Sequence, residues 1–108
     1  MADDGKAIKQ LYDESIEEVQ RVLFSLDATD AERKVARQSL RKLTALLLAQ
    51  TIKTVEGRTA LLNGLIDELG KVIEKIKVKP PLQNVLDRLN GAVAKAKKLL
   101  DQQGKTNA

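Results

Sequence analysis

The feature that most constrains this chain is a run of positions spaced alternately four and three residues apart. The run continues for nine positions without interruption, and eight of the nine are apolar: Leu48, Ile52, Val55, Thr59, Leu62, Ile66, Leu69, Ile73 and Ile76. This spacing places all of them on one face of an α-helix. A face of this kind is stable in water only when it packs against other apolar faces, so the rest of the chain must cover it.

The other segments repeat the same rhythm, which predicts an all-α protein. The matching positions are Tyr12, Ile16, Val19, Leu23 and Leu26, then Ala36, Leu40, Leu43 and Leu47, and finally Leu82, Leu86, Leu89, Val93, Ala96 and Leu100. A length of 108 residues suits one domain with a single core. Tyr12 and Phe24 are the only aromatic residues, so this core is aliphatic.

Capping and proline signals divide the chain into segments. Thr29 and Glu32 have the spacing of a capping box, and Pro80 and Pro81 interrupt any helix. We predict a single helical domain over residues 1–108, built as an antiparallel four-helix up-down bundle. The expected helices cover about residues 3–26, 30–56, 59–78 and 81–103, with a frayed tail at 104–108 that follows Gly104.

Gly57 leaves two architectures open. If it ends one helix and Thr59 caps the next, the chain forms the four-helix bundle. If the helix runs through Gly57, the chain has three helices with one long central helix, completed by dimerisation. The unbroken spacing favours the long helix, and the segment lengths favour the break, which we adopt.

The residues needed for common enzyme chemistry are missing. The chain has no Cys and no His, which removes thiolate nucleophiles and a near-neutral general base. It contains no glycine-rich phosphate loop, and its acidic cluster lacks the histidines of a di-metal bundle site: Glu14, Glu17 and Glu18. We therefore expect a non-enzymatic protein without cofactor or metal.

The sequence also predicts where the protein resides. Its start is acidic and polar, with no apolar signal region behind it. The longest apolar run, Ala45 to Ala49, is far too short to span a bilayer. We expect a soluble, cytoplasmic protein without a transmembrane segment.

Residues 43–49 predict a contact surface, because they are apolar on nearly every side of their helix. Such a helix needs neighbours on more than one side. The predicted interface includes the flank of the next segment and consists of Leu43, Leu46, Leu47, Leu48, Leu61, Leu65 and Val72. The leading hypothesis is a protein that works through helix–helix contacts, as an adaptor, chaperone-like or assembly subunit. Its partner is another protein or a second copy of itself.

A basic ridge on the second helix supports an alternative function. It consists of Arg33, Lys34, Arg37, Arg41 and Lys42, and its arginines recur every four residues. Such a ridge could contact phosphates of a nucleic acid or nucleoprotein. The competing interpretation is a solvated face that pairs with the acidic first helix, because the first 28 residues carry seven Asp or Glu against three Lys or Arg. A membrane surface is less favoured, since the apolar faces are explained by a core.

Overall fold

The computed structural model describes residues 3–76 and 79–107, and this part of the chain forms four α-helices. A short 3-10 helix precedes the last of them. In chain order the elements are α1 (Asp3–Leu23), α2 (Asp30–Ala49), α3 (Val55–Ile76), η1 (Pro80–Leu82) and α4 (Gln83–Asn107).

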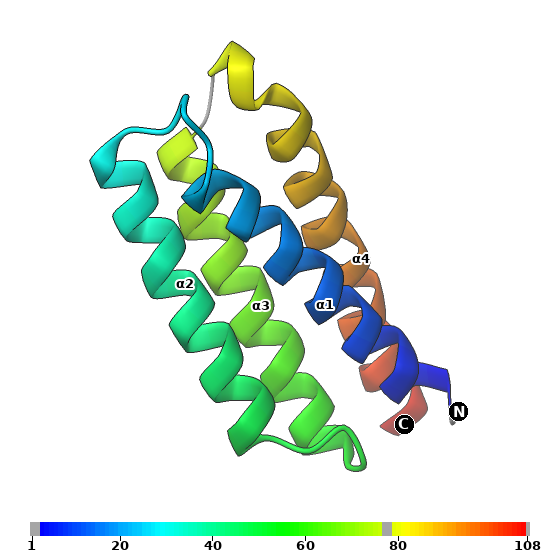
Figure 1. The fold of residues 1–108 in the computed structure, drawn as a ribbon. Helices are drawn as coiled ribbons and strands as arrows, with labels where there is room; N and C mark the ends of the chain where they lie inside the picture. Colours follow the sequence, from blue (N-terminus) through cyan, green and yellow to red (C-terminus); the bar gives the residue numbers. More distant parts are fainter. Residues whose placement is uncertain (1–2, 77–78, 108) are drawn as a thin grey trace.

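The helices form an antiparallel up-down bundle, as predicted. Each of α1 and α3 packs against both α2 and α4, so that α2 and α4 lie diagonally opposite (Figure 1). The α1–α2 connection and η1 lie at one end of the bundle, and the start of α1 and the end of α4 lie at the other (Figure 1). The longest dimension is 44 Å. Short connections between amphipathic helices produce this topology, because each helix must return along its predecessor to bury its stripe.

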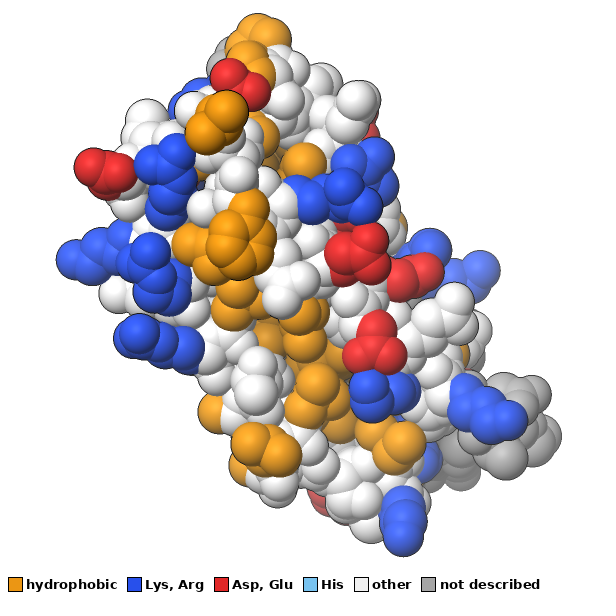
Figure 2. All heavy atoms as spheres, in the orientation of Figure 1, with side chains coloured by type: hydrophobic (Ala, Val, Ile, Leu, Met, Phe, Trp, Pro, Cys, Tyr) orange, Lys and Arg blue, Asp and Glu red, His pale blue; other side chains and the backbone are white. Residues whose placement is uncertain are grey.

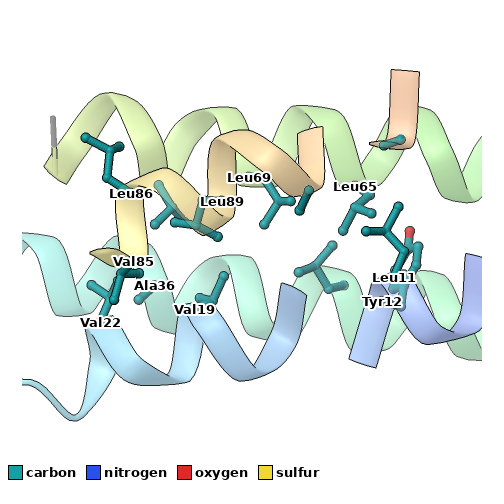
Figure 3. Close-up of a cluster of buried hydrophobic side chains, with 14 of the residues drawn as sticks. Leu11, Tyr12, Val19, Val22, Ala36, Leu65, Leu69, Val85, Leu86 and Leu89 are labelled. Atoms are coloured by element: carbon teal, nitrogen blue, oxygen red, sulfur yellow. The ribbon is translucent and has the colours of Figure 1, made fainter. Parts of the chain in front are cut away.

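The core contains aliphatic side chains from all four helices and one aromatic ring. Figure 3 shows members of this cluster converging from opposite sides, among them Val19, Ala36, Leu69 and Leu89. Tyr12 is fully buried, and its hydroxyl donates to the carbonyl oxygen of Leu61. Burial raises the pKa of Tyr12 above its ordinary value, and the nearby charge of Glu68 adds to this effect.

The connection between α1 and α2 confirms the capping box and corrects the end of the first helix. Thr29 Oγ1 accepts from the Glu32 N–H over 3.1 Å, and Glu32 Oε1 accepts from the Thr29 N–H over 2.8 Å. However, α1 ends at Leu23 rather than at residue 26. The Ser25 hydroxyl accepts from the Asp27 N–H, which stabilises a turn in place of another helical turn. As a result Leu26 is 97% exposed, although its spacing placed it on the buried stripe.

The chain breaks between α2 and α3, so the alternative with one long central helix is wrong. The break lies earlier than predicted, because α2 ends at Ala49 rather than at residue 56. Gln50 is extended, with φ −109° and ψ 154°. The helix α3 then begins at Val55 rather than at residue 59. Thr54 caps it instead of Thr59, because Thr54 Oγ1 accepts from the Gly57 N–H over 3.0 Å.

Gly57 has a different role from the predicted one. It lies inside the first turn of α3, where a Cβ would come within 1.8 Å of the Thr51 carbonyl oxygen. Only glycine allows the preceding loop to approach the helix this closely. The nine-position run is therefore interrupted by a loop over residues 50–54, and its spacing continues on both sides.

The prolines separate α3 from α4, as predicted. Lys79 is extended, with φ −124° and ψ 101°, which is the conformation that a following proline favours. Pro80, Pro81 and Leu82 form η1, so α4 begins at Gln83 rather than at the predicted residue 81. The predicted end of the third helix at residue 78 lies outside the described residues.

The last helix does not end at Gly104, which corrects the predicted boundary at 103. It continues to Asn107, through most of the stretch that was expected to fray. Gln103 is 1% exposed and forms hydrogen bonds to both Asp4 and Arg58. These bonds attach α4 to the start of α1 and the first turn of α3, which holds the end of α4 in place.

A second polar contact joins the connections at the opposite end of the bundle. Lys79 Nζ lies 2.6 Å from Glu32 Oε1, and both side chains are largely buried. Burial alone would raise the pKa of Glu32. Hydrogen bonds from Lys79 and Thr29, together with the charge of Lys79, outweigh the effect of burial and hold the pKa of Glu32 below its usual value.

Candidate functional site

Four of the seven predicted interface residues belong to the core of the bundle. Leu43, Leu61, Leu65 and Val72 have almost no exposed surface, because they face the other helices of the same chain. Their apolar character is therefore explained by intramolecular packing. This narrows the predicted interface to the three remaining leucines.

The remaining three leucines differ in their surroundings. Leu46 and Leu47 are half-buried and pack against the core. Leu46 fills the space beside Gly64 on α3, where a Cβ would lie 2.4 Å from Leu46 Cδ1. Leu48 contributes little to the fold, because it is 84% exposed. Of the predicted interface residues, Leu48 is the one whose side chain is mostly exposed.

Leu48 borders a shallow depression on the outer face of α2. The depression is lined by Leu40, Arg41, Thr44, Ala45 and Leu48. Together with Arg37, which lies one turn before Arg41, these residues are called the docking face below. Figure 2 shows Lys and Arg side chains along the edge of the molecule that α2 occupies in Figure 1, beside a band of hydrophobic side chains.

The structure places most of the predicted basic ridge in solvent. Arg33 is the exception, because it is half-buried and donates to the Ser25 carbonyl oxygen over 2.9 Å and to Asp30 over 3.2 Å. The other four members are exposed: Lys34, Arg37, Arg41 and Lys42. Arg33 thus has a structural role, and the exposed members form the free part of the ridge.

Three of the four exposed members of the ridge have no carboxylate partner in the described structure. Lys34, Arg37 and Arg41 form no ion pair with any residue that the structure describes. Residues 33–49 contain no Asp or Glu, so α2 offers no carboxylate along this face. The ridge can therefore accept an anionic partner without breaking an existing pair.

The expected pairing between the ridge and the acidic face of α1 is absent among the described residues. The acidic face lies against α4 instead, where Glu18 Oε1 lies 2.8 Å from Arg88 Nε. Glu17 pairs along its own helix, 3.0 Å from Arg21. A groove of about 490 Å³ runs between α1 and α4 beside these pairs, with Leu11 among its lining residues. Its walls carry both acidic and basic side chains, so it does not select a partner by net charge.

Two exposed hydrophobic residues of the α1–α2 connection were not predicted as site residues. Phe24 is 76% exposed and Leu26 is 97% exposed. Phe24 lies off the apolar spacing of α1, and this was a usable signal. Leu26 gave no such signal, because its spacing matched the stripe.

The described residues contain neither a metal-binding cluster nor a membrane-crossing helix. Among residues 3–76 and 79–107, no group of three or more His, Cys, Asp or Glu side chains could hold a metal ion. No described helix has the length and hydropathy needed to cross a membrane.

A comparison with known proteins identifies no relative of this chain. No family model, no curated protein and no solved structure matches the chain.

Proposed function

We propose that this protein is a non-enzymatic, cytoplasmic helical bundle that binds other proteins through helix–helix contacts, as an adaptor, chaperone-like or assembly subunit. The observation that carries this proposal is the exposure of Leu48 beside the unpaired Arg37 and Arg41 on the outer face of α2. Interfaces combine apolar anchors and arginines in this way, since both gain from losing contact with water against a matching surface.

The energetics favour a contact at this position. The core is closed by the four helices, so Leu48 is not needed to complete it. Burying an exposed leucine against a partner is worth about 1.5–3 kcal/mol. The stems of Arg37 and Arg41 can cover further apolar surface while their charged groups remain at the rim.

Site-specific photo-crosslinking in the cells that produce the protein tests this proposal. A photoreactive amino acid replaces Ala45 within the docking face, and a matched variant carries it at Asn90. Both positions are exposed, but Asn90 lies on α4, diagonally opposite α2. We expect a protein adduct from position 45 that is absent from position 90. Equal labelling at the two positions, or no protein adduct at position 45, would contradict the proposal.

A second candidate function is nucleic-acid binding through Lys34, Arg37 and Arg41. It is favoured by the absence of carboxylate partners on this ridge in the described chain. Binding to phosphates would weaken steeply as salt concentration rises, because each contact releases counterions. A gel-shift measurement at low salt checks this function, and no shift by the wild-type chain would exclude it.

A further inference from the structure

We propose that the partner of the docking face is an amphipathic helix that carries carboxylates along one flank and packs on α2 as a fifth helix. This inference depends on the proposed function above, because it names the chemistry of the protein that binds there.

The geometry of the docking face matches the surface that one helix presents to another. Arg41, Thr44, Ala45 and Leu48 have the spacing i, i+3, i+4 and i+7, which forms the four-residue hole that accepts a side chain from a facing helix. Arg37, Leu40, Arg41 and Thr44 repeat this spacing one turn earlier. The observed depression lies over the first of these holes, so a side chain from a helix packed along α2 can enter it.

The size of the residues around these holes also suits close approach. Thr44 and Ala45 are small and exposed, while Leu40 is half-buried at the base and Leu48 projects at one end. A leucine of the partner can therefore enter between Arg41 and Leu48 and contact apolar atoms. The depression needs no rearrangement of α2 to receive it.

The charges determine what must flank the apolar residues of the partner. Docking removes water from Arg37 and Arg41, and an arginine that loses water without gaining an anion opposes binding. The structure describes no carboxylate of this chain paired with either residue. A glutamate or aspartate flank on the partner supplies the missing anions, and a lysine flank would be repelled.

A second copy of this chain does not meet these requirements. If two α2 helices faced each other, the contact would hold four arginines from Arg37 and Arg41 and no carboxylate, because residues 33–49 contain no Asp or Glu. The other helices use their apolar stripes inside the bundle, and the exposed Phe24 and Leu26 lie in the α1–α2 connection rather than on a helix. The occupant is therefore a helix from a different chain.

Two synthetic peptides of about 18 residues, long enough to form a helix on docking, test this proposal. Both carry leucines at heptad a and d positions and remain monomeric, and the flanking positions hold Glu in one peptide and Lys in the other. Binding to the isotope-labelled chain is followed in its amide NMR spectrum. We expect the Glu peptide to shift signals of residues 37–48 and to bind about tenfold or more tightly than the Lys peptide.

Charge reversal provides the decisive control. The double variant Arg37→Glu with Arg41→Glu should bind the Lys peptide more tightly than the Glu peptide. The variant Leu48→Glu should lose affinity for the Glu peptide, while Lys95→Glu with Lys98→Glu on α4 should bind both peptides as the wild type does. Equal affinity for both peptides, no reversal in the double variant, or shifts centred away from residues 37–48 would overturn the proposal.

The crosslinking experiment separates this inference from the proposed function. A protein adduct at position 45 combined with no binding of the Glu peptide would overturn the acidic helix and leave protein binding intact. No protein adduct at position 45 would overturn both. A gel shift with duplex DNA, without binding of either peptide, would assign the ridge to nucleic acid and overturn the acidic helix.

Discussion

The side chains of Gln103 and Asp4 are joined by a hydrogen bond although 99 positions separate them in the sequence. Gln103 Nε2 donates to Asp4 Oδ2 over 2.9 Å, and Gln103 Oε1 accepts from Arg58 Nε over 2.7 Å. Arg58 in turn donates to the Ile52 carbonyl oxygen over 2.9 Å. One buried amide therefore connects α1, α4, the start of α3 and the loop before it.

Replacing Gln103 by Ala should destabilise the bundle by about 1–3 kcal/mol, because it leaves buried polar groups without partners. Urea unfolding followed by circular dichroism measures this difference. Gln102→Ala is the matched control, since Gln102 is half-buried and makes no hydrogen bond to the described chain. Equal losses in the two variants would show that the amide contacts are not responsible.

Two glycines should respond to alanine in opposite directions. Gly57→Ala should destabilise the protein by about 2 kcal/mol or more, because the new Cβ would collide with the Thr51 carbonyl oxygen. Gly70→Ala should stabilise it by about 0.5–1 kcal/mol, because Gly70 lies inside α3 with no neighbour within 4 Å of a Cβ. Thermal or urea unfolding of both variants checks the pair. A stabilised Gly57→Ala variant would refute the close approach of the loop.

Ionisation of Tyr12 should coincide with alkaline unfolding. Its pKa is raised in the folded state, so above the ordinary value of 10.0 the unfolded chain releases a proton that the folded chain retains. The stabilisation associated with Tyr12 is therefore complete below about pH 10 and decreases as the pH rises further. Tyr12 is the only tyrosine, so phenolate absorbance reports this residue alone.

We expect the phenolate signal to rise together with the loss of helical circular dichroism. Tyr12→Phe should unfold at higher pH than the wild type, because it has no hydroxyl to ionise. Phenolate formation in a chain that stays fully helical would contradict the buried position of Tyr12.

The contact between Glu32 and Lys79 should make the free energy of unfolding depend on pH in the acid range. The pKa of Glu32 is lowered in the folded state, so its contribution is complete above the ordinary value of 4.5 and is lost as the pH falls through the folded pKa. Glu32→Gln keeps a capping side chain and removes the charge. The free energies of unfolding of the two proteins should therefore converge below pH 4.5. In a Lys79→Met background, the effect of Glu32→Gln on the free energy of unfolding at neutral pH should be smaller. If Glu32→Gln has the same effect at neutral and at acid pH in the wild-type background, the contact is contradicted.

Adjacent leucines of α2 should differ in their importance for folding. Leu48→Glu should change the free energy of unfolding by no more than about 0.5 kcal/mol, because the side chain is exposed. Leu47→Glu should cost about 1–3 kcal/mol, because it places a carboxylate on a half-buried position that packs against the core. Chemical denaturation distinguishes the two. Equal destabilisation would show that Leu48 supports the fold, and it would not be a suitable probe of docking.

The sequence predicted the number and order of the helices because spacing and caps act locally. It was less successful at helix ends, where weak signals compete. We predicted Thr59 as the cap of the third helix, whereas the structure starts α3 at Val55 and gives the capping hydrogen bond to Thr54. Leu26 matched the stripe, yet the turn stabilised by Ser25 ends α1 before it.

The predicted site residues included Leu48, Arg37 and Arg41 of the docking face, but the sequence did not indicate how their side chains are oriented. Residues 43–49 are apolar on nearly every side of their helix, so their spacing does not reveal which leucine faces the neighbouring helices. Leu43 proved to be buried and Leu48 exposed, a distinction that depends on the positions of α1 and α3. The buried position of Gln103 was missed because a polar residue next to Gly104 is typical of an exposed chain end. Its role depends on Arg58 and Asp4, which are distant in the sequence.

The contact between Asp4 and Gln103 brings the start of α1 close to the end of α4, so the same bundle could form with the helices connected in a different order. Because α1 begins and α4 ends at the same end of the bundle, a short linker from residue 107 to residue 3 could join them. New ends could then open beside the exposed Leu26, where few packing contacts would be cut. Such a circular permutant would make α2 the first helix and would leave its outer face unobstructed.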